Sequence, residues 1–185
     1  WINGGSDARI GGSAPAARNV ISGNANHGVL VYGSGASGAV FQGNFMGTNP
    51  AGTAVLGNSF SAIFTGSNVI YNDPNPSEAV DVRIGGTAPG EGNLLSGNTG
   101  FGVEIYGFNP NGAATMLGDT RIEGNRMGTN AAGTAALPNG QSAVLVRRNP
   151  TGITIGGSAP GAGNLASGNR LGGFLVEVSD AVLVE

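Results

Sequence analysis

The chain has 185 residues, a net charge of −3, eight arginines, and neither lysine nor cysteine. This length suits one domain, and the lack of a basic excess gives no electrostatic footprint for nucleic acid. The lack of cysteine excludes disulfides and thiolate metal sites. Glycine accounts for 36 residues without a Gly-X-Y period, which excludes collagen, and no apolar run is long enough to span a bilayer.

Short runs of alternating apolar residues recur along the chain, and they are of three kinds. The first kind follows a small residue, as at 29–31, the second leads to a glycine, as at 82–84, and the third ends in asparagine, as at 94–98. Each has three to five residues with a period of two, which predicts β-strands and is too short for an amphipathic helix. From residue 20 onward the kinds follow in the fixed order third, first, second: 20–24, 29–31, 39–41, then 45–49, 63–65, 82–84, then 94–98, 103–105, 120–122, then 126–130, 144–146, 153–155, and finally 165–169 and 175–177.

Longer phrases repeat at regular spacing around these runs. IGGTAPGEGNLLSGN at 84–98 has close copies at 10–24 and 155–169, and FQGNFMGTNPAGTAVLGN at 41–58 has a copy at 122–139. Such repeats predict a solenoid. Three short strands followed by a return to the first kind make one coil of a parallel β-helix, in which like strands stack into three parallel sheets. We therefore predict an all-β, single-stranded parallel β-helix of about five coils, forming one domain over residues 1–185.

Two types of coil alternate, because each of the two long phrases occurs only in every second coil. A loop that recurs in every second coil has twice the strand spacing, about 10 Å, in which to fold. Asparagines at strand bends are expected to bond to their stacked neighbours, since asparagine tolerates the left-handed conformation. The expected rows are Asn24, Asn98 and Asn169, and separately Asn44 and Asn125.

The alternation of IGG-x-APG-x-GN-x-x-SGN with GN-x-MGTN-x-AGTA-x-L resembles the right-handed parallel β-helix repeats of large bacterial extracellular proteins. The resemblance covers nearly the whole chain. It implies a fold of the pectate-lyase-like kind and a secreted or cell-surface setting. It implies no activity, because such repeats occur in lyases, hydrolases, adhesins, tailspikes and passive stalks alike.

The two ends lack the polar caps that solenoids need to stay soluble. An uncapped coil offers a row of unpaired backbone groups. Two explanations are open. The favoured one is that the sequence is a segment of a longer rod, and the other is that copies stack end to end into filaments.

Strand alternation in the first sheet turns Val29 and Val31 inward and predicts two outward rows. The rows are Leu30, Phe64, Glu104, Leu145 and Leu175, and then Tyr32, Gly66, Tyr106, Arg147 and Glu177. Tyr32, Phe64 and Tyr106, with Arg147 beside them, are a candidate platform for sugar rings, another protein or a neighbouring rod. The alternative is that a loop of the same chain covers this face, and the segments 55–56 and 136–137 are apolar enough to do so.

The outward row of the second sheet carries three arginines, Arg9, Arg83 and Arg121, interspersed with Val40 and Thr154. Guanidinium groups bind carboxylates in a bidentate way, so this row is a second candidate site, for uronate or sulfate groups. The alternative is a solvated face that Glu123 partly neutralises.

Catalysis would need a different constellation. Glycoside hydrolysis uses two carboxylates roughly 5–10 Å apart, whereas Glu104, Asp119, Glu123 and Glu177 fall on different rows or coils. The single histidine, His27, has no neighbouring pair of aspartates and is expected at the surface. No cofactor is expected, because the oxygen-rich segment 72–78 can be explained by its prolines and turn-forming residues without calcium.

The sequence thus favours an extracellular structural or adhesive module that presents a flat face or assembles with copies of itself. The alternatives are a carbohydrate-binding module and, after it, a polysaccharide lyase or hydrolase. The expected partners are further copies, the rest of a longer chain, or polysaccharide, with no nucleic acid and no membrane span.

Overall fold

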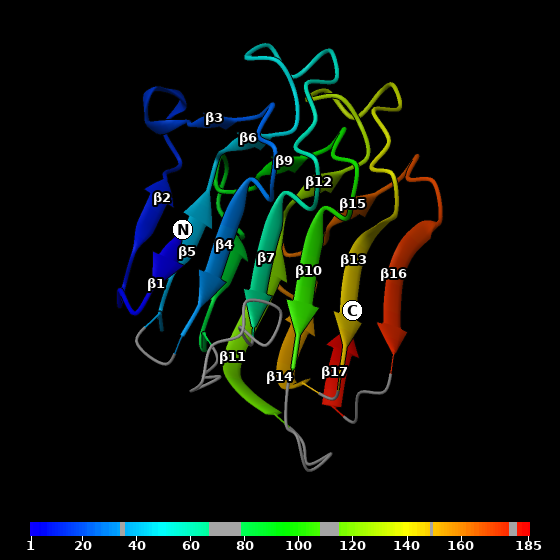
Figure 1. The fold of residues 1–185 in the computed structure, drawn as a ribbon. Helices are drawn as coiled ribbons and strands as arrows, with labels where there is room; N and C mark the ends of the chain where they lie inside the picture. The colour runs from blue at the N-terminus through cyan, green and yellow to red at the C-terminus, as the bar shows by residue number, and fades with distance from the viewer. Residues whose placement is uncertain (34–35, 67–78, 108–114, 149, 178–180) are drawn as a thin grey trace.

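The computed structural model describes residues 1–33, 36–66, 79–107, 115–148, 150–177 and 181–185. The chain winds through three sheets in which every described strand pair is parallel, as Figure 1 shows. The first sheet contains β1 (Ile2–Asn3), β4 (Val29–Tyr32), β7 (Ile63–Gly66), β10 (Val103–Tyr106), β13 (Ser142–Arg147) and β16 (Gly172–Glu177).

The other two sheets complete each coil. The second sheet contains β2 (Arg9–Gly11), β5 (Val40–Gln42), β8 (Arg83–Gly85), β11 (Thr115–Glu123), β14 (Pro150–Ile155) and β17 (Ala181–Val184). The third sheet contains β3 (Val20–Ile21), β6 (Phe45–Met46), β9 (Leu94–Leu95), β12 (Arg126–Met127) and β15 (Leu165–Ala166). The predicted parallel β-helix with three sheets is confirmed.

The core fills the interior of the coils. Ile84 and Ile122 lie side by side on neighbouring strands of the second sheet, β8 and β11, and are 1% and 0% exposed. They belong to one continuous cluster that also contains Val31 and Val103 of the first sheet and Leu95 of the third. Alternation therefore places the apolar residues inside, as the period of two predicts.

Two columns of asparagine flank the third sheet. The upstream ladder, before each third-sheet strand, is Asn19, Asn44, Asn93, Asn125 and Asn164, and the downstream ladder, after it, is Asn24, Asn58, Asn98, Asn139 and Asn169. In both, each Nδ2 donates to the Oδ1 of the next rung over 2.8 to 3.1 Å. The stacking of asparagines is confirmed. The predicted members of each row share one ladder, but the rows are incomplete, because asparagines of the other coil type, such as Asn58 and Asn93, lie between them.

The second amide hydrogen of the inner rungs is also used. Asn93 Nδ2 donates to Phe41 O over 2.9 Å, and Asn98 Nδ2 donates to Met46 O over 3.1 Å. Both carbonyls belong to the preceding coil. Every coil is thus tied to both of its neighbours by side chains as well as by sheet hydrogen bonds, which satisfies polar groups that the narrow core would otherwise leave unpaired.

The two coil types carry their loops on opposite sides of the third sheet. In one type the loop precedes the third-sheet strand (Gly11–Asn19, Gly85–Asn93 and Gly156–Asn164), and in the other it follows (Thr48–Asn58 and Thr129–Asn139). The following loops begin with antiparallel bridges, Thr48 to Val55 and Thr129 to Ala136. Two rows of loops therefore border the third sheet, one along each ladder.

Glycine decides the shape of the preceding loops. Gly90 and Gly161 have φ of +84° and +86°, and a Cβ at either position would come within 2.2 Å of a backbone oxygen of the loop two coils earlier. The first copy has Ala16 at this position and forms a short 3-10 helix, Pro15–Ala17, instead. The difference follows from the steric penalty that a Cβ meets in the left-handed region.

We expect Gly92→Ala and Gly163→Ala to have opposite effects, although these glycines occupy equivalent positions in two copies. A Cβ on Gly92 would lie 1.9 Å from Gly124 O, whereas one on Gly163 would meet nothing within 4 Å. Overpacking should cost Gly92→Ala about 1–3 kcal/mol of unfolding free energy. Gly163→Ala should be neutral or stabilising by about 0.4–1 kcal/mol. Denaturant unfolding of both variants measures the difference, and equal effects would contradict the packing described.

The outermost coils expose apolar side chains. Trp1 is 75% exposed at one end, and Phe174, Val176 and Leu183 are 40%, 41% and 51% exposed at the other. None of the described segments forms a helix with the length and apolar character that a membrane crossing requires.

Candidate functional site

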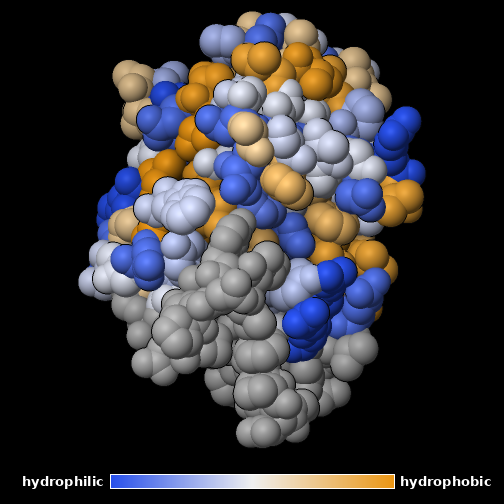
Figure 2. Space-filling view, viewed as in Figure 1, coloured by the Kyte–Doolittle hydropathy of each residue, from blue (hydrophilic) through white to orange (hydrophobic). Residues whose placement is uncertain are grey.

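The predicted first-sheet platform has the expected register but is buried. Leu30 pairs with Phe64, and Phe64 pairs with Glu104. Tyr32, Phe64 and Tyr106 are 5%, 1% and 4% exposed, and with Leu30 they form a second apolar cluster outside the main core. In this conformation the platform leaves almost no ring surface for a ligand, so sugar binding by these residues stays a prediction that would require the face to open. Figure 2, seen from this side, shows apolar and polar residues intermixed.

Aromatic and cationic side chains lie against this cluster. His27 packs against Phe60 and Phe64 with ring centroids 5.2 Å apart in both cases. The guanidinium of Arg147 lies 4.4 Å from the centroid of Tyr106, a cation–π contact. Arg147 is thus brought to Tyr106 as predicted. His27 is half-buried, so its expected place at the surface is only partly right.

The two segments considered as a possible cover of this face lie elsewhere. Val55 and Leu56 remain 54% and 51% exposed, and Leu56 O accepts the N–H of Gly23 beside the third sheet. Leu137 O accepts the N–H of Gly97 in the same way. Both segments return to the downstream ladder, whose rungs Asn58 and Asn139 end these loops, so they are not the cover of this face.

A small polar cluster lies among these rings. Ser61 Oγ donates to Glu104 Oε2 over 2.6 Å and accepts the N–H of Phe101. Burial raises the pKa of Glu104, while the hydrogen bond from Ser61 and the charge of Arg147 oppose the rise. Burial lowers the pKa of His27 to about 4, and the N–H of Ser61 donates to its Nδ1 over 3.2 Å. At neutral pH the imidazole of His27 is therefore neutral, and burial disfavours the charged form of Glu104 in the same cluster.

Replacing Glu104 with glutamine should stabilise the protein more, relative to wild type, at pH 7 than at pH 4. A carboxyl whose pKa is raised on folding binds its proton more tightly in the native state, so its charged form destabilises the fold as the pH rises. Glutamine keeps an acceptor for Ser61 and removes the charge. Unfolding free energies at the two pH values measure the difference, and the contribution of His27 cancels because both proteins contain it.

The exposed Glu177 of the same sheet provides the control. Glu177→Gln removes one carboxylate without relieving a buried charge. A pH-independent difference for Glu104→Gln, or the same pH dependence for Glu177→Gln, would contradict the assignment.

The arginine row of the second sheet is present but largely paired. Arg9, Val40, Arg83 and Arg121 follow one another in register. Arg121 lies 2.9 Å from Asp119 and 3.6 Å from Glu123, and Arg83 lies 3.9 Å from Asp119. Hydrogen bonding to Asp119 raises the pKa of Arg121. Two of the three predicted anion-binding arginines thus already have carboxylate partners, and anion binding by this row stays a prediction.

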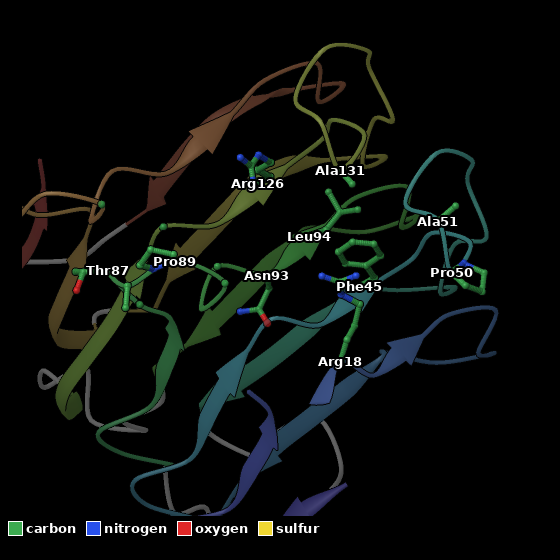
Figure 3. Close-up of a pocket in the computed structure, with 16 residues that line it drawn as sticks. Arg18, Phe45, Pro50, Ala51, Thr87, Pro89, Asn93, Leu94, Arg126 and Ala131 are labelled. Atoms are coloured by element: carbon green, nitrogen blue, oxygen red, sulfur yellow. The ribbon is translucent and has the colours of Figure 1, made fainter. Parts of the chain in front are cut away.

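A groove lies over the third sheet, between the two rows of loops. Its volume is about 710 Å³, and Phe45 and Leu94 on neighbouring strands form part of its floor. Figure 3 shows these two side chains between Pro89 on one side and Pro50 and Ala51 on the other. Arg18 and Arg126 also line it. The guanidinium of Arg18 stacks 4.0 Å from the centroid of Phe45, and its Nε donates to Gly43 O over 3.1 Å.

The walls of the groove are continuous although each loop occurs only in every second coil. Ala131 N–H donates to Gly52 O over 2.9 Å, which joins the two following loops directly. Gly90 and Gly161 lie close against Ser13 O and Thr87 O, which brings the preceding loops together. A ligand would therefore meet one channel that runs parallel to the β-helix axis across β6, β9 and β12.

The sequence predictions did not include this groove, although the signal was present. Counting from each asparagine of the upstream ladder aligns Asn-x-apolar five times, and the middle residue faces outward. Those residues are Val20, Phe45, Leu94, Arg126 and Leu165, in register across the sheet. The strands have only two residues each, so their alternation alone carried too little information.

No group of three or more histidine, aspartate or glutamate side chains within the described ranges is arranged to hold a metal ion. The segment 72–78, considered for calcium, lies outside the described residues.

Comparisons with protein-family models, curated proteins and solved structures found no match to this chain. The functional assignment therefore depends on the geometry of the chain itself.

Proposed function

We propose that this chain is an extracellular structural and adhesive module, a stiff β-solenoid that presents its third-sheet groove to a partner. The extracellular setting, and a place in the pectate-lyase-like superfamily, are proposed from the resemblance of the repeats. The proposal rests mainly on one observation: the groove has continuous walls, and hydrogen bonds between stacked asparagines join the coils that carry those walls.

Two features support a presenting role. The ladders connect each coil to the next, so the relative positions of the loops are fixed by hydrogen bonds such as Asn58 Nδ2 to Asn98 Oδ1, 2.8 Å. The loops themselves join across coils through Ala131 and Gly52. A binding face on rigid elements loses little conformational entropy when a partner binds.

Adhesion can be measured with microspheres that carry the chain covalently. We expect them to be retained under flow on surfaces coated with microbial or plant polysaccharides or with the chain itself, and bare microspheres to be washed away. Retention on none of these surfaces would overturn the adhesive role.

Assembly with further copies is a second candidate, favoured by the apolar edge of the last described coil. Phe174 and Leu183 are 40% and 51% exposed on the edge strands of two sheets, where a further coil would add in the same register. Sedimentation velocity should show mass increasing with concentration, and Phe174→Asp should reduce the increase. A monomer at all concentrations would exclude stacking of this edge.

A further inference from the structure

We propose that the groove over the third sheet binds an anionic polysaccharide, lying along the axis of the β-helix between the two loop walls. This inference rests on the proposed adhesive role and adds to it the chemical class of the ligand. The first support is shape, because an open channel with continuous walls suits a long chain better than a compact small molecule.

The charge of the groove supports an anion. Arg18 and Arg126 line it, and no aspartate or glutamate is among the described residues that do. Within the described part of the chain, neither arginine forms an ion pair, whereas Arg83 and Arg121 on the second sheet both do. The groove is thus a local positive channel in a protein with net charge −3. Guanidinium groups bind carboxylate and sulfate oxygens in the same planar, bidentate way.

The arginines are also suitably placed. Arg18 is held over Phe45 by stacking and by its Nε hydrogen bond, which leaves its terminal nitrogens for a ligand. Arg126 lies two strands further along the sheet, a separation of about 10 Å at the usual strand spacing. In a two-fold polyuronate every second sugar turns its carboxylate to the same side, so one chain can reach both guanidiniums. Leu94 lies between them on the floor but is only 2% exposed, so the guanidiniums and the loop walls would make most of the contacts with the sugar rings.

An acidic peptide fits less well. Extended peptides bind to sheets mainly by adding a strand at a free edge. The floor strands β6 and β9 have a partner on both sides, so they offer no free edge to an incoming backbone. Recognition must therefore come from side chains and loops, which favours a ligand with regularly spaced charged groups on stiff rings.

The test measures binding of the full chain by isothermal titration calorimetry. The probes are a polyuronate oligomer, a sulfated glucan oligomer, an uncharged glucan of the same length, and polyglutamate. We expect the uronate or the sulfated chain to bind, the uncharged glucan to bind at least about tenfold more weakly, and added salt to weaken binding. Which of the two anionic chains binds more tightly identifies the anionic group.

The variants are Arg126→Gln and Arg18→Gln, with Arg170→Gln as the control. Arg126 is exposed and its side chain forms no hydrogen bond within the described part of the chain, so its replacement should not affect folding. Loss of one charge-assisted contact should weaken binding about tenfold or more in each groove variant. Arg170 is exposed outside the groove lining, so Arg170→Gln changes the net charge equally and should bind like wild type.

Equal weakening by Arg170→Gln would overturn the site, as would equal binding of the uncharged glucan. Polyglutamate that binds as tightly as the anionic glycans would overturn the choice of a polysaccharide. Microspheres that still adhere when both groove variants are combined, while the soluble glycans fail to bind, would overturn this inference and leave the adhesive role intact.

Discussion

Asn93→Ala is expected to lower the unfolding free energy by about 3 kcal/mol or more, because each buried polar group left unpaired costs about 1–3 kcal/mol. Asn93 is 2% exposed. Its Oδ1 accepts both the backbone N–H and the Nδ2 of Asn44, and its Nδ2 donates to Phe41 O and Asn125 Oδ1. Alanine removes all four bonds, and water cannot readily replace them inside the ladder.

Asn19→Ala in the same ladder is the matched control. Asn19 is exposed on the first rung, and its side-chain Nδ2 donates to Asn44 Oδ1 over 3.0 Å. We expect its loss to cost about 1 kcal/mol or less. Guanidinium unfolding followed by circular dichroism measures both variants. Similar costs at the two rungs would contradict the larger contribution assigned to the buried bonds of Asn93.

Asn93→Asp extends this test to pH. The carboxylate would place an acceptor against the oxygens of Phe41 and Asn125, which the amide nitrogen now bonds. The native state would then favour the protonated acid, so the pKa of the new side chain should lie above its unfolded value. The loss of stability should be greatest at neutral pH and should shrink as the pH falls toward about 4. A pH-independent loss would contradict this reasoning.

The repeats predicted the fold well because its main rules are local. A period of two fixes which residues face inward, so the burial of Ile84 and Ile122 followed from sequence alone. The order of the three strand kinds fixed the coil. The outward rows of the first and second sheets were likewise predicted in the correct register.

What covers each row could not be predicted, because cover depends on segments distant in sequence. Tyr106 alternates outward but is buried, and Arg147 of the next coil stacks on its ring, whereas Arg121 is paired with Asp119, two residues earlier in the same strand β11. The groove was missed for a related reason. Its walls arise only when the loops of alternate coils are placed on opposite sides of the third sheet, and repeat spacing does not give that side.

Thr65→Val is expected to stabilise the protein by about 1–2 kcal/mol. Thr65 is 1% exposed in the inward row of the first sheet, between Val31 and Ile105, and its Oγ1 has no hydrogen-bond partner among the described residues. A buried hydroxyl without a partner is costly, and valine has nearly the same shape without that cost.

Thr120→Val is the matched control, because Thr120 is equally buried but its Oγ1 donates to Leu117 O and accepts the N–H of Val82. That variant should lose about 1–3 kcal/mol. Thermal and denaturant unfolding compare the two, and a loss of stability in both variants would mean that the Thr65 hydroxyl does have a partner, such as a buried water.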